Sequence, residues 1–289
     1  MPRTTASLVC YKNSLAELKP LLLSLMEDPS ISKWLLVDNG AAENPEHGSH
    51  LRELTQQYGG IYIAPRKNIG FGSGHNAALK ALGGIPSDFH LMLNPDIVFD
   101  RNVLPSLIAI MDARPGAGLI MPRVLYPDNT TQYLCKLLPT PLDFALRRFA
   151  PGILRQFARH RMDRYELRGM DSAQRAEVPF LSGCFMFTRR TALESIGGFD
   201  ERYFLYMEDV DLCRRLAITS ELLYWPTVSI AHRHERGSHK NMKLMLTHVR
   251  SAILYFNKWG WIFDAARSKT NRAALARLTH PHSSVQEDH

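Results

Sequence analysis

The chain has 289 residues and 45% hydrophobic content, enough to bury the core of one large α/β domain or of two small ones. Its four cysteines are far apart and form no Cys-x-x-Cys pair, which argues against a zinc site or a disulfide framework and favours reduced cytosolic thiols. A formal net charge of +7 favours an anionic partner: nucleic acid, an acidic membrane surface or a phosphorylated substrate.

Strand patterns alternate with helical patterns through the first hundred residues, which predicts an α/β fold with a mostly parallel central sheet flanked by helices. The expected strands are 7–11, 33–37, 61–64 and 89–93, and the expected helices are 14–26, 51–58 and 74–82. Ligands of such open sheets bind beyond the carboxyl ends of the strands. Asp38, Asn68 and Asp96 fall at such ends, so we expect a binding site there.

The second half of the chain predicts a continuation of the sheet and then a helical extension. Its expected helices are 103–113, 191–195, 209–217 and about 240–258, and its expected strands are 118–122, 222–225 and 228–231, with a pattern also at 180–189. We divide the chain into a first half of about 1–122, a second half of about 123–240 with a basic insertion at about 140–176, a helical extension at 241–270 and a disordered tail at 271–289.

Three carboxylates stand within four positions of the chain. Glu208, Asp209 and Asp211 follow the apolar run 203–207. Carboxylates beside apolar residues are costly unless a cation or a catalytic task requires their charge, so this cluster is a candidate active site. The alternative is a solvated turn that opens the helix at 209–217, where acids favour the positive end of the helix dipole.

The motifs around these acids resemble the acceptor-side signature of a known enzyme family. Gly-Cys-Phe-Met starts at Gly183, Gly-Gly-Phe-Asp-Glu starts at Gly197, and Glu-Asp-Val-Asp-Leu-Cys starts at Glu208. This order resembles the inverting glycosyltransferase family 2, which has the GT-A fold. The resemblance implies that Asp209, the second acid of the pair, is the general base, and that Gly183, Glu208 and Asp211 lie on the acceptor side.

A glycine-rich loop at 68–76 opens the helix expected at 74–82, where backbone N–H groups can approach an anionic ligand. A tight turn is the simple alternative, and the absence of a Gly-x-Gly-x-x-Gly spacing argues against a Rossmann dinucleotide site. Family 2 members carry Asn-x-Gly and Gly-x-Asn here, beside the sugar nucleotide. The resemblance therefore implies that Asn68, Gly70 and Asn76 border the donor.

The strand at 89–93 ends in Asn94-Pro95-Asp96, which resembles a degenerate form of the Asp-x-Asp motif of GT-A enzymes. In that family a divalent ion neutralises the departing diphosphate, and Mg²⁺ or Mn²⁺ prefers carboxylate oxygens. The resemblance implies that Asp96 is a metal ligand and that Asn94 contacts ribose or phosphate. The alternative is an Asn-Pro turn in which Asp96 caps the next helix.

A histidine follows the strand expected at 228–231. His232 precedes a Gly-Ser pair within about six residues, as in family 2, which implies a second contact to the metal or the diphosphate. His234 and His239 are the alternatives for this role. The basic residues around them add charge against a diphosphate or simply form a solvated loop.

Two residues at the first strand ends are candidates for contacts to the base. The resemblance implies that Asp38 accepts the imide N–H of uracil or thymine. Tyr11 ends the first strand and is expected to lie against the base. The alternatives are an Asp-Asn-Gly turn at Asp38 and an aromatic residue at the edge of the sheet.

The run from Tyr255 to Asp264 closely resembles the C-terminal region of bacterial L-rhamnosyltransferases that build O-antigen and related polysaccharides. The whole resemblance covers about residues 5–270. It implies an inverting enzyme that uses Mg²⁺ or Mn²⁺ and transfers L-rhamnose from dTDP-β-L-rhamnose to a saccharide hydroxyl. UDP-galactofuranose, UDP-N-acetylglucosamine or UDP-glucose is the alternative donor.

A non-catalytic protein that binds carbohydrate or nucleic acid is the alternative from a different functional class, although the sequence contains no recognised nucleic-acid-binding module.

The basic insertion combines arginines with Leu, Ile and Phe residues. Its arginines are Arg147, Arg148, Arg155, Arg159, Arg161, Arg164 and Arg168. This pattern suits a helix on anionic lipid, and a solvated helix face is its alternative. The aromatic residues from Trp259 to Phe263 suit an interfacial anchor, and a packed helix end is their alternative.

No apolar run reaches the roughly 18 residues of a membrane span, and the run at 6–11 is too short for a signal peptide. We expect a cytoplasmic protein that is peripheral on the inner face of the cell membrane and acts on an undecaprenyl-diphosphate-linked acceptor. The sequence is compatible with an oligomer.

Overall fold

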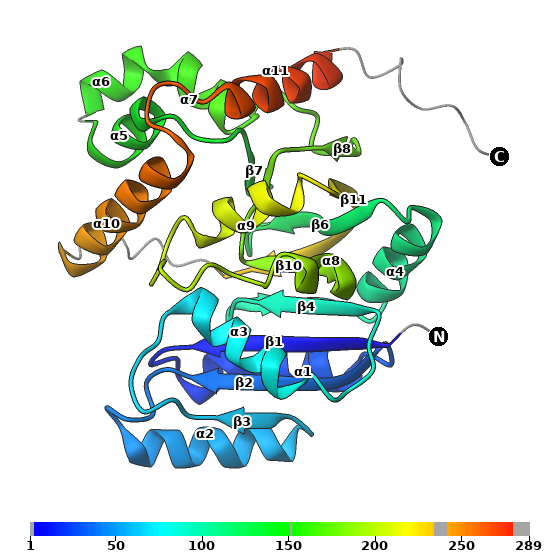
Figure 1. Cartoon of the computed structure of the whole chain (residues 1–289). Helices are drawn as coiled ribbons and strands as arrows, with labels where there is room; N and C mark the ends of the chain where they lie inside the picture. Colours follow the sequence, from blue (N-terminus) through cyan, green and yellow to red (C-terminus); the bar gives the residue numbers. More distant parts are fainter. Residues whose placement is uncertain (1–2, 151, 234–241, 280–289) are drawn as a thin grey trace.

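A computed structural model of the protein describes residues 3–150, 152–233 and 242–279. Within these ranges, nine strands form one sheet with the order β3-β2-β1-β4-β10-β6-β11-β5 and with β8 paired to β11 (Figure 1). They are β1 (Thr4–Cys10), β2 (Ile31–Asp38), β3 (Ile61–Ile63), β4 (Phe89–Leu93), β5 (Ile97–Val98), β6 (Ala117–Leu125), β8 (Ala176–Glu177), β10 (Phe185–Arg189) and β11 (Glu221–His232). A small antiparallel sheet joins β7 (Cys135–Lys136) to β9 (Phe180–Leu181).

The first strands form the parallel half of the sheet that the alternating pattern predicts. β1 pairs in parallel with β2 and β4, and β2 pairs in parallel with β3. Cys10 lies opposite Asp38 and Leu8 lies opposite Leu93, so the carboxyl ends of three strands meet at one edge. β10 runs antiparallel between β4 and β6, and β6 pairs in parallel with β11, which gives a mixed sheet.

Helices cover both faces of the parallel half because side chains of a strand alternate between the two faces. Leu8 packs in the buried cluster that contains Leu18 and Leu22 of α1, whereas its neighbour Val9 packs with Ala78 of α3. The helices around the sheet are α1 (Leu15–Glu27), α2 (Pro45–Gln57), α3 (Phe71–Ala81), α4 (Val103–Ala113), α8 (Arg190–Ser195) and α9 (Glu208–Leu216). The predicted α/β class is therefore confirmed.

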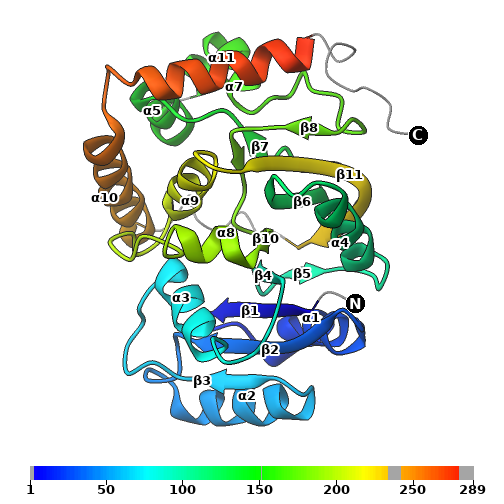
Figure 2. The same cartoon turned by 45° about the vertical axis from the view of Figure 1, so that its right-hand side comes forward.

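A helical layer covers the end of the molecule opposite β3 and α2 and extends along one side, where α10 lies beside α9 (Figures 1 and 2). It consists of α5 (Pro141–Phe149), α6 (Gly152–Phe157), α7 (Arg159–Tyr165), α10 (Met242–Trp259) and α11 (Ala265–Thr279). The helical extension expected at 241–270 continues to Thr279. The expectation of disorder was therefore wrong for 271–279, where α11 packs on the rest of the chain through the buried Ala274. Residues 280–289 lie outside the described part of the chain. The expected boundary near residue 122 falls inside β6, so the two halves share one sheet.

The glycine-rich loop is docked on the loop that precedes α9. Gly70 has φ +89°, and a Cβ at this position would overlap the carbonyl oxygen of Phe204 and lie 2.9 Å from its carbonyl carbon. The N–H of Phe71 donates to that same carbonyl oxygen at 3.0 Å. The third residue of the Asn-x-Gly motif is therefore glycine both for its backbone conformation and for this close approach.

Gly70→Ala should lower the free energy of unfolding by about 2 to 4 kcal/mol, because it combines a strained φ with an overlap against Phe204. Denaturation with urea measures the loss. Gly84→Ala is the matched control, since a Cβ there meets nothing within 4 Å. Equal stability of the two variants would mean that the glycine-rich loop is not docked as described.

Candidate functional site

The edge at the carboxyl ends of β1, β2 and β4 gathers the residues expected around a nucleotide. Asp38 is buried, and its carboxylate accepts hydrogen bonds from the Tyr62 hydroxyl and from the N–H of Gly40, both at 2.8 Å. These two bonds fix the plane of the carboxylate. Tyr11 is 44% exposed, and its hydroxyl donates to Glu43 at 3.0 Å. Its ring is therefore held at the surface of this edge.

The glycine-rich loop is tied to the end of β2. The side chain of Asn39, which is buried, donates to the carbonyl of Gly70 at 3.0 Å and accepts from the N–H of Ile69 at 3.2 Å. Asn68 accepts from the N–H of Gly70 at 2.9 Å, which closes an Asx turn. The loop thus lies beside Asp38, as the predicted donor site requires.

Asn76 lies on the far side of that loop, on α3, and is directed at the acceptor-side motif. Its amide accepts from the N–H of Phe199 at 2.9 Å and donates to the carbonyl of Phe199 at 2.9 Å and to Glu201 at 3.0 Å. These bonds join α3 to the Gly-Gly-Phe-Asp-Glu motif. Its contact with the donor stays a prediction, whereas its clamping role is evident.

Asp96 and His232 meet at the other end of this edge. β5 pairs with the end of β11, which places His232 opposite Ile97, and Nε2 of His232 lies 3.2 Å from Oδ1 of Asp96. Asn94 is held beside them, since its N–H donates to the carbonyl of Cys184 at 2.9 Å. The alternatives His234 and His239 lie outside the described residues.

The ring of His232 is oriented by Gln132. The amide nitrogen of Gln132 donates to the carbonyl oxygens of His232 and Leu125, at 2.8 and 3.2 Å, which leaves its oxygen to face the ring. That oxygen lies 2.9 Å from Nδ1 of His232 and can only accept, so Nδ1 carries the proton. Such a partner fixes the tautomer in which Nε2 is available to a metal.

The pair of Asp96 and His232 fits a divalent cation. A carboxylate oxygen and an imidazole nitrogen suit Mn²⁺ and, through the carboxylate, Mg²⁺. No group of three or more His, Cys, Asp and Glu side chains suited to a metal gathers elsewhere among the described residues.

The Glu208–Asp209 pair opens α9 directly after two strained residues. Tyr206 and Met207 both have positive φ, +70° and +66°, which non-glycine residues rarely adopt and which is common at functional sites. One oxygen of Asp209 accepts from the N–H of Gly183 at 3.1 Å, and the other accepts from the N–H of Val210 at 2.9 Å. The carboxylate of Asp209 is thus held in one orientation at the junction of α9 and β10.

The surroundings raise the proton affinity of both acids. Burial raises the pKa of Asp209, and the N–H groups of Gly183 and Val210 oppose this rise. Burial, and then the charge of Asp209, raises the pKa of Glu208 to about 8. One oxygen of Glu208 is buried without a hydrogen-bond partner in the described structure, which fits a carboxyl that holds its proton near neutral pH.

Cys184 joins the two centres. The residue before it, Gly183, binds Asp209, and its own carbonyl accepts from Asn94, two positions before Asp96. Burial raises the pKa of the Cys184 thiol, and the charges of Asp96 and Asp209 raise it further. The backbone of Gly183 and Cys184 therefore connects the Asn94–Asp96 segment to Asp209.

Asp211 belongs to a different set of contacts. It is fully buried and accepts from Arg215 at 2.8 Å and from Trp259 at 2.8 Å, with the ammonium of Lys258 at 2.7 Å. These partners attach α10 to α9. Asp211 thus holds the helical layer in place, and its predicted contact with an acceptor stays a prediction.

Sequence reasoning missed three residues of this site: Asn39, Gln132 and Lys136. Lys136 is buried on β7, where burial and then the charge of Arg147 lower its pKa to about 7, while Glu166 and Asp209 act in the opposite direction. A lysine inside a run of apolar residues, between Cys135 and Leu137, is the one signal that could have identified it. The two amides carry no such signal.

Comparison with known proteins identifies the family. Residues 36–251 match the family model described as glycosyltransferase like family 2. The N-acetylglucosaminyl-diphospho-decaprenol L-rhamnosyltransferase of Mycobacterium tuberculosis is 28% identical over 272 residues, which cover 89% of this chain and 85% of that protein. Rhamnosyltransferase WbbL of Escherichia coli K12 is 25% identical over 275 residues, 91% of this chain and 95% of that protein.

Solved structures share the fold at low identity. The crystal structure of GalNAc-T7 with UDP, GalNAc and Mn²⁺ superposes with a TM-score of 0.61 at 11% identity, over 94% of this chain and 54% of that chain. The mannosyltransferase PcManGT of Pyrobaculum calidifontis, in complex with GDP-Man and Mn²⁺, gives a TM-score of 0.55 at 17% identity, over 98% of this chain and 76% of that chain. Both superpositions support the GT-A fold.

Glu208→Gln should change how stability depends on pH. A carboxyl whose pKa is raised by folding favours the folded state at low pH, and this contribution is lost as the pH rises toward the folded pKa of about 8. Between pH 5 and 8 the unfolding free energy of the wild type should therefore fall relative to the variant, by up to about 1.4 kcal/mol per pH unit. Urea denaturation at several pH values measures the difference. The exposed Glu53→Gln is the control, and parallel pH profiles for wild type and Glu208→Gln would contradict a buried, protonated Glu208.

Proposed function

Because the chain belongs to glycosyltransferase family 2, it is a glycosyltransferase of GT-A fold, and we propose that it transfers L-rhamnose from dTDP-β-L-rhamnose to a lipid-linked saccharide. The names of the two rhamnosyltransferase relatives support this donor. The acceptor follows from the name of the mycobacterial relative, which includes a diphospho-decaprenol. We infer a role in bacterial surface polysaccharide synthesis, with an undecaprenyl-diphosphate carrier.

The observation that carries the mechanism is the fixed carboxylate of Asp209. Two backbone N–H groups orient it, and burial raises its pKa and with it the affinity of the carboxylate for a proton. Asp209 takes the proton from the acceptor hydroxyl while that oxygen bonds to the anomeric carbon. The bond from that carbon to the diphosphate breaks on the opposite face, so the β-linked donor gives an α-L-rhamnoside.

Other residues bind the donor and the leaving group. Asp38 accepts the imide N–H of the base, and the loop from Asn68 to Gly70 borders the sugar nucleotide. Asp96 and His232 would hold the divalent ion, which would supply positive charge for the departing diphosphate. The charge of Asp209 acts on buried Lys136, whose pKa is about 7. Lys136 therefore adds positive charge to this site when it is protonated.

The proposed donor can be tested against its rivals with the purified protein. dTDP should raise the melting temperature more than UDP or GDP, and more with Mn²⁺ than without it, because a nucleotide that binds the native state stabilises it. NMR of the transfer product should then show an α-L-rhamnoside. A larger effect of UDP would favour UDP-galactofuranose, UDP-N-acetylglucosamine or UDP-glucose, and a β-linked product would exclude inversion.

Asp96→Ala should weaken the metal-dependent part of dTDP affinity by about tenfold or more, and His232→Ala should give a smaller defect of the same kind. Gln132→Leu should also weaken it, since partners that orient a metal ligand typically contribute about 10- to 100-fold in affinity. Calorimetry with and without MnCl₂ separates the metal-dependent part from the rest. The exposed Asp100→Ala is the control. Wild-type dTDP affinity that is the same with and without Mn²⁺ and Mg²⁺ would refute the metal assignment.

A further inference from the structure

The loop between α10 and α11 presents apolar side chains to solvent. Ile262 is 78% exposed and Phe263 is 94% exposed, and Trp261 beside them is 44% exposed. Leu142 and Phe149 of the neighbouring α5 and Phe157 of α6 are exposed as well. Isolated exposed apolar residues are common, whereas a group of them along adjoining elements marks an interaction surface.

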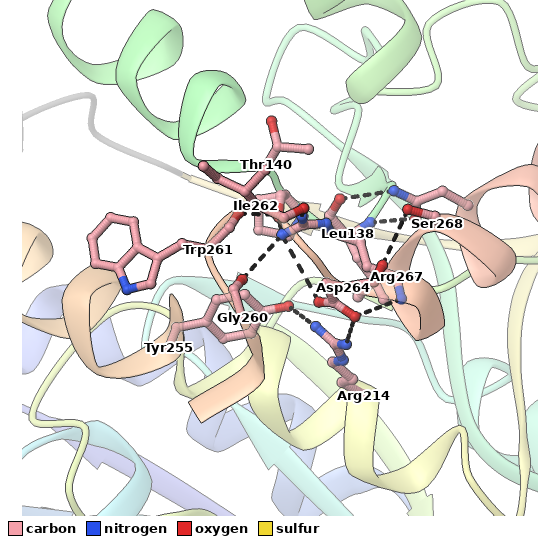
Figure 3. A network of polar contacts seen from close by, with 12 residues as sticks. Leu138, Thr140, Arg214, Tyr255, Gly260, Trp261, Ile262, Asp264, Arg267 and Ser268 are labelled. Carbon is pink, nitrogen blue, oxygen red and sulfur yellow. Dashed lines mark hydrogen bonds and ion pairs between the residues drawn. The ribbon is translucent and has the colours of Figure 1, made fainter. Parts of the chain in front are cut away.

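Buried polar contacts hold this loop in place. Arg267 is buried and donates to the carbonyl oxygens of Trp261 and Ile262 at 3.3 Å and to that of Pro139 at 3.3 Å (Figure 3). Asp264 accepts from Arg214 at 2.6 Å and caps the first turn of α11 through the N–H of Arg267 at 2.9 Å. The exposed tip is therefore built on a fixed base and joined to the start of α5.

The loop starts with a glycine that no other residue can replace without strain. Gly260 has φ +105°, and a Cβ there would lie 2.7 Å from the carbonyl oxygen of Phe263. Its N–H donates to Phe256 at 2.8 Å, which ends α10. After this turn Trp261 folds back on α10, where its ring lies 5.2 Å from that of Phe256 and its N–H donates to Asn257 at 2.8 Å, whereas Ile262 and Phe263 are left in solvent.

The helical layer that carries this loop is strongly basic. Residues 141–165 and 242–279 contain 13 Lys and Arg but only 3 Asp and no Glu, whereas the whole chain has 35 and 28. The layer therefore has a net charge of +10, and the rest of the chain has −3. No helix in the described ranges combines the length and the apolar character that crossing a bilayer requires.

We propose that this helical layer docks on an anionic lipid bilayer, with Ile262 and Phe263 inserted at the interface. Apolar side chains among basic ones suit the acyl boundary and the anionic headgroups together. A second copy of this chain would instead bring together two layers that each have a formal net charge of +10. The proposal rests on the proposed function for its purpose, namely to bring the site to a lipid-linked acceptor.

The layer also contacts the acceptor side directly. Ser251 of α10 donates to the carbonyl of Leu205 at 2.8 Å, and Trp259 donates to Asp211 at 2.8 Å. Leu205 and Asp211 flank the Glu208–Asp209 pair along the chain. The proposed docking surface is therefore joined directly to the segment that contains Glu208 and Asp209.

Sedimentation of the full chain with vesicles tests this docking. The protein should bind phosphatidylglycerol/phosphatidylethanolamine vesicles and not phosphatidylcholine vesicles, and 0.5 M NaCl should weaken the binding. Ile262→Ser/Phe263→Ser should weaken it about tenfold or more, because two apolar side chains no longer leave water. Ile218→Ser is the control, since Ile218 is 73% exposed outside the layer. Its binding should equal that of the wild type.

A second readout follows Trp261, which is next to the inserted pair. Brominated lipids should quench tryptophan fluorescence of the wild type, and Trp261→Phe should lose most of that quenching. Equal binding of the wild type and the double variant, absence of binding to anionic vesicles, or a solution dimer that the double variant abolishes would each overturn the proposal. The assays contain no donor or acceptor, so their failure leaves the transferase activity untouched, and an inactive enzyme can still bind.

Discussion

The junction between the glycine-rich loop and the loop before α9 is the contact on which the rest of the site depends. Gly70 lies against the carbonyl of Phe204. Two residues after Phe204 come Tyr206 and Met207, the two strained residues that directly precede α9. Strain of this kind persists only where the surrounding structure fixes it. Asn76 supplies part of that support through its bonds to Phe199. The same contact joins the glycine-rich loop to the segment before Asp209, so the positions of the proposed donor site and of the proposed base are set together.

Burial is the second constraint, because it determines how the acids behave. Two adjacent carboxyl groups in a poorly solvated site cannot both ionise readily, so burial raises the pKa of Glu208 and of Asp209. Asp209 keeps two N–H bonds that favour its charged form, which suits a base. Lys136 is a buried cation near this pair, and its pKa near 7 leaves its charge responsive to the protonation of its neighbours. The site therefore contains groups that exchange protons near neutral pH.

Much of the fold could be predicted because its strands are continuous apolar runs and its motifs lie at strand ends. The placement of Asp38 and Asp96 at strand ends and of Asp209 at the start of a helix was predicted from that pattern. The contacts of Gln132 and Asn39 could not be predicted, because their amides bind residues that are distant in the sequence. Asp211 was expected on the acceptor side, which stays a prediction, and its contacts with Trp259 and Lys258 become visible only in three dimensions. The helix at 271–279 was expected to be disordered because it contains few large apolar residues, although Ala274 is buried.

In the proposed mechanism, Asp209 takes the proton of the acceptor hydroxyl. The most direct test is the turnover of purified wild type and Asp209→Asn with the sugar nucleotide that the donor screen selects, together with calorimetry of nucleotide binding. An asparagine can still accept the N–H of Gly183, so folding and nucleotide affinity should stay near wild type. Turnover should fall by about two to four orders of magnitude, the usual contribution of a general base. A variant that retains more than half of the wild-type turnover would contradict the account.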